Sequence, residues 1–267
     1  MGKKVIGVFA AICLVLLIFN KSSNKENLSD IYVNTVSKYK KNQEINNKEI
    51  QRGLENFEYL KDEDGRITHS FKEDDKFLNF VCGENEKVEE IQYTKNIQGT
   101  NVKLSYFTNQ SKFIIGTISE NELIYKEILS KFELDKTDMQ KQYEEVFEKA
   151  LEGKVELKIE DISKILNISP DKETYKDSDS ELVLTRYSFK GQMEYFTIDY
   201  CEDLNKIVGE TYSKYNSDLS MNRFYNFFTS EVTNKGELSM SSVITLENIK
   251  EDKDLLEIVN QLEMLGK

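Results

Sequence analysis

The sequence predicts an α+β fold in which an N-terminal transmembrane helix precedes two tandem repeats. Three observations support this prediction: an apolar run near the N-terminus, segments of helical periodicity followed by segments of alternating polarity, and a second half that resembles the first. Each repeat is expected to hold a helix pair, an antiparallel sheet of about five strands and a closing helix. The predicted boundaries are 1–27 for the anchor and tether, 28–137 for the first repeat and 138–267 for the second.

The N-terminal segment indicates export. Lys3 and Lys4 precede residues 5–19, which contain no polar side chain, and this order is typical of an export signal. Fifteen apolar residues span about 22 Å, short of the ~30 Å hydrocarbon core, although lysine snorkelling and local thinning can close such a gap. The positive charges favour a cytoplasmic N-terminus and an extracytoplasmic body.

Cleavage of this segment is the alternative, and it would give a secreted protein. The residues after Phe19 offer no good pair of small residues for a signal peptidase, and Ile12 before Cys13 argues against a lipoprotein site. We therefore expect an uncleaved, single-pass signal-anchor that holds residues 28–267 outside the cytoplasmic membrane.

The evidence for duplication lies in matched segments. Residues from Phe71 align with residues from Phe189 when one residue is inserted. Residues from Ile31 and from Val102 also have counterparts in the second half, in the same order, from Gln142 and from Arg223. The identities are Phe71/Phe189, Lys72/Lys190, Cys82/Cys201, Lys87/Lys206 and Tyr93/Tyr212.

Helices are predicted where apolar residues recur every three to four positions. The clearest pattern covers 139–151 and ends at Gly153, and a shorter one covers 159–166 before Ser169-Pro170. Weaker patterns cover 29–41 and 46–57. A capping box of Ser119 and Glu122 predicts the start of the first closing helix, and residues 255–265 predict its counterpart.

Strands are predicted where polarity alternates, as in residues 77–82 and 196–200. Short polar turns at 84–86, 98–100 and 234–236 favour antiparallel neighbours. A helix pair followed by an antiparallel sheet is similar in outline to β-lactamase-inhibitor-like and small outer-membrane-assembly lipoprotein modules. The resemblance rests on element order and not on motifs, and those modules are shorter.

The charge of the chain limits its partners. The net charge is −12 overall and −15 over residues 28–267. Such a body repels phosphate backbones at long range, so nucleic acid is not an expected partner. A protein or peptide with a basic face is expected, and its association should slow as salt rises. The alternative is that the charge only maintains solubility.

No residue is predicted to be catalytic, cofactor-binding or metal-ligating. His69 is the only histidine and is expected at the surface or at a sheet edge. Cys82 and Cys201 are expected to be buried free thiols, because equivalent positions in two repeats lie too far apart for a disulfide. No P-loop, G-x-G-x-x-G or C-x-x-C motif occurs. No cofactor is predicted.

Acidic residues cluster at 62–66, 73–75 and 171–181, without the spacing of a calcium loop, and solvated turns are expected there. Aromatic residues at 224, 225, 227 and 228 predict either a strand buried on both faces or a contact surface. The leading hypothesis is a membrane-anchored, extracytoplasmic binding or accessory protein that is not an enzyme. A carboxylate-dependent hydrolase and a structural subunit of an envelope complex are the alternatives.

Overall fold

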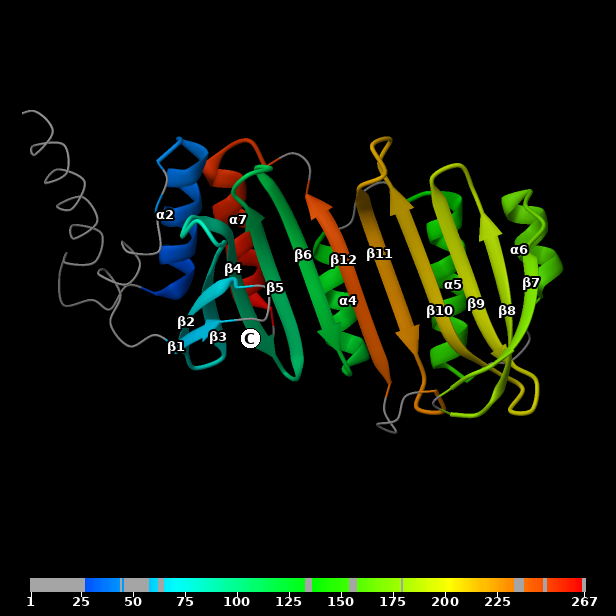
Figure 1. Ribbon diagram of the computed structural model, residues 1–267. Helices are drawn as coiled ribbons and strands as arrows, with labels where there is room; N and C mark the ends of the chain where they lie inside the picture. The colour runs from blue at the N-terminus through cyan, green and yellow to red at the C-terminus, as the bar shows by residue number, and fades with distance from the viewer. Residues whose placement is uncertain are drawn as a thin grey trace, which may run out of the picture. The chain divides into compact units, whose positions relative to one another are not determined.

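The computed structural model describes residues 27–43, 45, 58–61, 65–132, 136–153, 158–178, 180–232, 238–246 and 249–265. Its five described helices are α2 (Leu28–Lys40), α4 (Glu122–Lys131), α5 (Asp138–Leu151), α6 (Ile159–Leu166) and α7 (Asp252–Met264). Figure 1 shows these helices together with the strands. The first six strands are β1 (Glu58–Lys61), β2 (Ile67–Glu73), β3 (Lys76–Cys82), β4 (Val88–Ile97), β5 (Thr100–Phe107) and β6 (Lys112–Ser119). The others are β7 (Asp171–Lys176), β8 (Val183–Lys190), β9 (Glu194–Cys201), β10 (Lys206–Tyr215), β11 (Met221–Phe228) and β12 (Ser239–Leu246).

The described strands form one twelve-stranded sheet in the order β1-β2-β3-β4-β5-β6-β12-β11-β10-β9-β8-β7. The prediction of two tandem repeats, each with its own sheet of about five strands, is therefore wrong. Its physical weakness is that two separate sheets would each expose an edge strand with unpaired backbone groups. Pairing β6 beside β12 removes both of those edges. The antiparallel pairing of neighbouring strands does agree with the sequence analysis.

The chain divides into two compact units that interleave along the sequence. Unit 1 contains the described residues up to Asn96, together with Lys103–Phe113 and Leu246–Met264. Unit 2 contains Ile97–Val102, Ile114–Thr245 and the C-terminal end from Leu265. The helix α7, which was predicted to close the second repeat, therefore belongs to unit 1.

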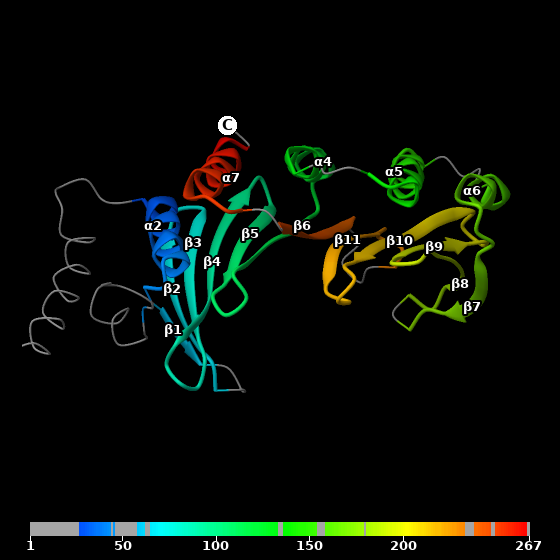
Figure 2. The same ribbon diagram turned by 90° about the horizontal axis from the view of Figure 1, so that it is seen from above.

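In unit 1, α2 and α7 cover the same face of the sheet (Figure 2). Asn27 caps α2 by accepting a hydrogen bond from Ser29 N. The C-terminal end of α7 is held by Lys95 on β4, whose ammonium group donates to the Glu263 carbonyl at 3.0 Å. The Glu263 carboxylate also accepts from Tyr93 and lies 2.9 Å from the Lys76 nitrogen. Charged contacts at a helix C-terminus thus fasten α7 to β3 and β4.

In unit 2, the helices α4, α5 and α6 lie on one face of the sheet (Figure 2). Buried aromatic rings join α5 to the strands beneath it, with Tyr143 5.8 Å from Tyr225 and Phe147 5.3 Å from Phe227 between ring centroids. Thr137 caps α5 through its hydroxyl, which accepts from Gln140 N at 3.2 Å. The apolar stripe predicted for 139–151 is therefore the face that α5 buries against the sheet.

Several local predictions are confirmed. The turn at 98–100 is a two-residue hairpin in which Gln98 and Gly99 both have positive φ, the geometry that matches the twist of an antiparallel pair. The predicted helices over 139–151 and 159–166 coincide with α5 and α6. The predicted helix over 46–57 and the turn at 234–236 lie outside the described residues.

The capping box is placed incorrectly by the sequence analysis. Asn121, and not Ser119, is the N-cap of α4, and its side chain accepts from Ile124 N at 3.3 Å. Ser119 is instead the last residue of β6, and its hydroxyl lies 2.6 Å from the Thr100 hydroxyl. The same hydroxyl accepts a hydrogen bond from Asn121 N at 2.9 Å, so Ser119 links the end of the strand to the N-cap of α4.

The predicted anchor, residues 5–19, also lies outside the described residues. None of the described helices has the length and hydrophobicity that a membrane span requires. The structure therefore gives no support to the transmembrane, single-pass assignment, and we do not retain it. The sequence already contained the physical reason for doubt, because fifteen apolar residues fall short of the roughly twenty that a span needs.

Candidate functional site

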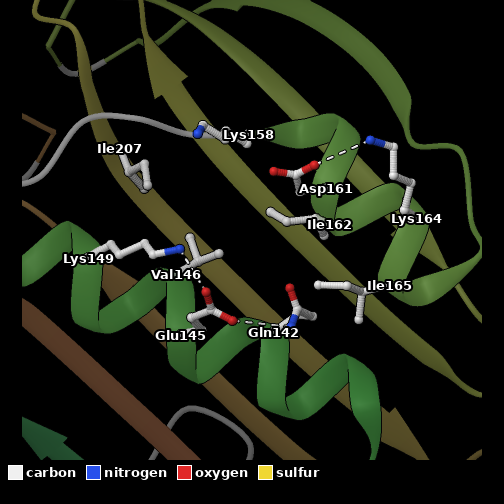
Figure 3. A pocket seen from close by; sticks show the side chains of 10 residues that line it. All are labelled: Gln142, Glu145, Val146, Lys149, Lys158, Asp161, Ile162, Lys164, Ile165 and Ile207. Carbon is white, nitrogen blue, oxygen red and sulfur yellow. Dashed lines mark hydrogen bonds and ion pairs between the residues drawn. The ribbon is translucent and has the colours of Figure 1, made fainter.

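The candidate site is a groove between α5 and α6 in unit 2 (Figure 3). Its volume is about 630 Å³, within the range of ligand-binding pockets. The helix α5 forms one wall, α6 forms the other, and Ile207 at the start of β10 contributes to the floor. The lining residues are Gln142, Glu145, Val146, Lys149, Lys158, Asp161, Ile162, Lys164, Ile165 and Ile207.

The floor of the groove is aliphatic. Val146, Ile162 and Ile207 are buried, whereas the side chain of Ile165 is 56% exposed. Ile162 and Ile165 are three residues apart on α6 and hence lie on the same side of that helix. The groove forms because the last turn of α6 places Ile165 beside α5 without covering it.

Lysine side chains surround this apolar floor. Lys149 lies 2.7 Å from the Glu145 carboxylate, and Lys164 lies 3.4 Å from Asp161. Lys158 is the third lysine of the lining and precedes the first residue of α6. The five charged lining residues carry a net charge of +1, in contrast to the acidic body.

A second hollow continues from the first. It has a volume of about 380 Å³ and lies between α5, the end of α6 and the turn that joins β8 to β9. Ile165 lines both hollows. The second hollow is lined by Asp138, Met139, Ile165, Leu166, Ile168, Gly191, Gln192, Met193 and Glu194.

The core of unit 2 holds an unusual carboxyl group beneath α4 and α5. Glu210 on β10 is 1% exposed, and within the described part of the chain neither of its carboxyl oxygens has a hydrogen-bond partner. Burial raises the pKa of Glu210 well above its ordinary value. Tyr125 and Tyr143 are close enough for the Glu210 charge to raise their pKa values, although burial is the larger cause for each.

His69 is not at the surface. It lies in β2, which neighbours the edge strand β1, and its side chain is 0% exposed. Its ring is 5.7 Å from the ring of Tyr59, and burial lowers its pKa. The histidine is therefore buried in unit 1, and the prediction of a surface or sheet-edge position is wrong.

Cys82 and Cys201 are both buried free thiols, as predicted. Burial raises the pKa of Cys82 to about 11, with smaller contributions from Glu89 and Glu86. Cys201 packs in a small cluster with Leu184 and Val208. Raised pKa values disfavour the thiolate, so the Cys82 thiol is a poor nucleophile.

The acidic clusters have different structures. Residues 73–75 form the β2–β3 turn, as predicted, but Asp171–Lys176 is the exposed strand β7 and not a turn. The cluster at 62–66 is only partly described. Across the described residues, no group of three or more potential metal ligands gathers at one point.

The aromatic strand β11 is buried on one face only. Tyr225 and Phe227 lie in the core, whereas Phe224 and Phe228 are half-buried on the opposite face. Gly209 permits this arrangement, because a Cβ atom there would lie 2.8 Å from the Phe228 ring.

Sequence analysis missed both Ile165 and Glu210 as residues of interest. Ile165 was part of an apolar helical pattern, and nothing in the pattern distinguishes a covered isoleucine from an exposed one. For Glu210 a signal was present, because alternation places it on the same face of its strand as Tyr212, among aromatic core positions.

Comparison with known proteins adds no relative. No protein-family model matches the chain, and no curated protein or solved structure is significantly similar to it.

Proposed function

We propose that the protein is an extracytoplasmic binding protein that holds an extended peptide segment of a partner protein in the α5–α6 groove. The exposed side chain of Ile165, shared by two adjoining hollows, is the observation that supports this proposal. Ile165 extends the apolar floor of Val146, Ile162 and Ile207 to the surface, and a contiguous apolar surface in a groove is typical of a contact site. The basic and apolar N-terminal segment supports the extracytoplasmic location.

The shape of the site favours a peptide over a compact small molecule. A small-molecule pocket usually encloses most of its ligand, whereas here the helices leave the floor open along α6 (Figure 3). The apolar floor would accept aliphatic side chains of the peptide. Lys149, Lys158 and Lys164 give the lining a net positive charge. Acidic side chains of the peptide would therefore form ion pairs with these lysines.

The lining of the groove has the opposite net charge to the chain as a whole. The overall net charge of −12 predicts a partner with a basic face, whereas the groove favours acidic residues at the point of contact. Both conditions are met by a partner whose acidic and aliphatic segment enters the groove while basic residues around it face the acidic surface. Such a partner would associate more slowly as salt rises.

A displayed library of random peptides, selected on the full chain, tests the proposal. Peptides recovered from the library are then titrated against Ile165→Asp and against Leu123→Asp. Leu123 is the matched control, because it is an exposed leucine on α4 of the same unit and does not line either hollow. Both substitutions add one negative charge to a helix surface.

We expect Ile165→Asp to weaken peptide binding at least about tenfold, which corresponds to about 1.4 kcal/mol. Leu123→Asp should leave binding unchanged. Equal binding by the two variants, or a library that yields no binder, would contradict the proposal. Circular dichroism of both variants checks that the fold is retained.

The hydrolase alternative lacks a specific supporting observation. A carboxylate pair with raised pKa values in a groove would favour it. In the described part of the chain, the carboxyl group with a strongly raised pKa is that of Glu210. It lies in the core of unit 2 and not in the groove.

A further inference from the structure

A fully buried acid beneath two helices has consequences for how those helices pack. Glu210 lies on the inner face of β10, opposite Ile198 of β9 and Phe227 of β11 in the sheet register. Its carboxyl group has no hydrogen-bond partner within the described residues. An ionised carboxylate without a partner is far more costly to bury than a neutral carboxyl group.

Among the described residues, no cation offsets the effect of burial on the pKa of Glu210. From the helices, Tyr125 of α4 and Tyr143 of α5 approach Glu210. From the strands, Tyr212 of β10, Tyr225 of β11 and Ser242 of β12 complete the inner-face cluster. Two cations lie further along this face. Arg223 donates to the Gln140 side chain at 2.7 Å and stands four residues along β11 from Phe227, the partner of Glu210. Lys214, the partner of Arg223 on β10, stands four residues from Glu210 and lies 3.6 Å from the Glu194 carboxylate.

We propose that Glu210 keeps its proton at neutral pH and that the packing of α4 and α5 on the sheet of unit 2 depends on that proton. When the carboxyl group ionises, the charge must reach water, and α4 and α5 cover the path. The helices therefore loosen from the sheet as Glu210 loses its proton. Because α5 is also a wall of the groove, the device would control access to that site, a consequence that rests on the proposed function.

The sign of the pH effect follows from proton binding. Burial holds the pKa of Glu210 well above its ordinary value in the folded protein. Between the two pKa values, the folded state therefore binds one proton that the unfolded state lacks. The contribution of Glu210 to the free energy of unfolding is therefore largest below the unfolded pKa of about 4.3. It falls as pH rises towards the folded pKa. The unfolding equilibrium constant rises about tenfold per pH unit from this group alone.

The first test compares Glu210→Gln with wild type in urea unfolding between pH 5 and pH 9. Glutamine has nearly the same shape and cannot ionise, so the pH dependence due to Glu210 disappears. We expect the ratio of the two unfolding constants to change about tenfold per pH unit below the folded pKa of Glu210 and to become constant above it. The control is Glu202→Gln, which removes a charge from an exposed turn between β9 and β10 and should give a constant ratio. Parallel wild-type and Glu210→Gln curves would overturn the proposal.

A second measurement uses the wild-type chain alone and holds even if Glu210→Gln fails to fold. With glutamate labelled at the ¹³Cδ carbon, one side chain should show the chemical shift of a protonated carboxyl group at pH 7. Backbone amides of α5 should also exchange faster above the titration of that group, after correction for intrinsic exchange. Titration of every glutamate below pH 6 would refute the proposal. None of these readouts uses a ligand, so they are independent of peptide binding in the groove.

Discussion

Two buried tyrosines in unit 2 should respond in opposite directions to the same substitution. The hydroxyl of Tyr143 has no hydrogen-bond partner among the described residues, whereas the hydroxyl of Tyr125 donates to the Ser241 carbonyl at 3.0 Å. Tyr143 lies on α5 and Tyr125 on α4, and both side chains are fully buried. Replacement of either by phenylalanine keeps the ring and its packing and removes only the hydroxyl.

The expected magnitudes follow from these hydrogen bonds. A buried hydroxyl without a partner costs about 1–3 kcal/mol, so Tyr143→Phe should stabilise the fold by about 1 kcal/mol after allowance for relaxation. A satisfied hydrogen bond contributes about 0.5–1.5 kcal/mol net, so Tyr125→Phe should destabilise by about 1 kcal/mol. The predicted difference between the variants is about 2 kcal/mol.

Urea denaturation followed by circular dichroism measures both variants against wild type. With an unchanged m-value, a shift of the midpoint reports the change in the free energy of unfolding. We expect the Tyr143→Phe midpoint to rise and the Tyr125→Phe midpoint to fall. A Tyr143→Phe variant that is less stable than wild type would show that its hydroxyl is satisfied, and the reasoning from its burial would be wrong.

Three further changes test other parts of the structure. Lys95→Met removes the donor to the C-terminal carbonyls of α7 and should cost about 2 kcal/mol, seen as faster amide exchange in α7. Gly209→Ala places a Cβ 2.8 Å from the Phe228 ring and should lower the free energy of unfolding by about 1–3 kcal/mol in urea denaturation. The control Gly116→Ala, whose Cβ would have no atom within 4 Å, should not destabilise the fold. Cys82, whose pKa burial raises to about 11, should react with a thiol reagent only after unfolding; rapid reaction in the native protein would contradict its burial.

The sequence alone determined much of the local structure. The apolar spacing of 139–151 and 159–166 identified α5 and α6, because helical amphipathicity depends on neighbours within a few residues. The turn at Gln98-Gly99 was also readable, since a residue pair with positive φ has few sequence solutions. That Cys82 and Cys201 are buried free thiols was also predicted.

Only the tertiary structure decided how these elements combine. The sequence predicted two sheets, and the structure has one, because whether β6 pairs beside β12 depends on residues that are more than one hundred positions apart. The assignment of α7 to unit 1 likewise rests on its contacts with β3 and β4. The groove and the buried Glu210 share this origin: an isoleucine is exposed, or a carboxyl group loses its solvent, only through the placement of other elements around it.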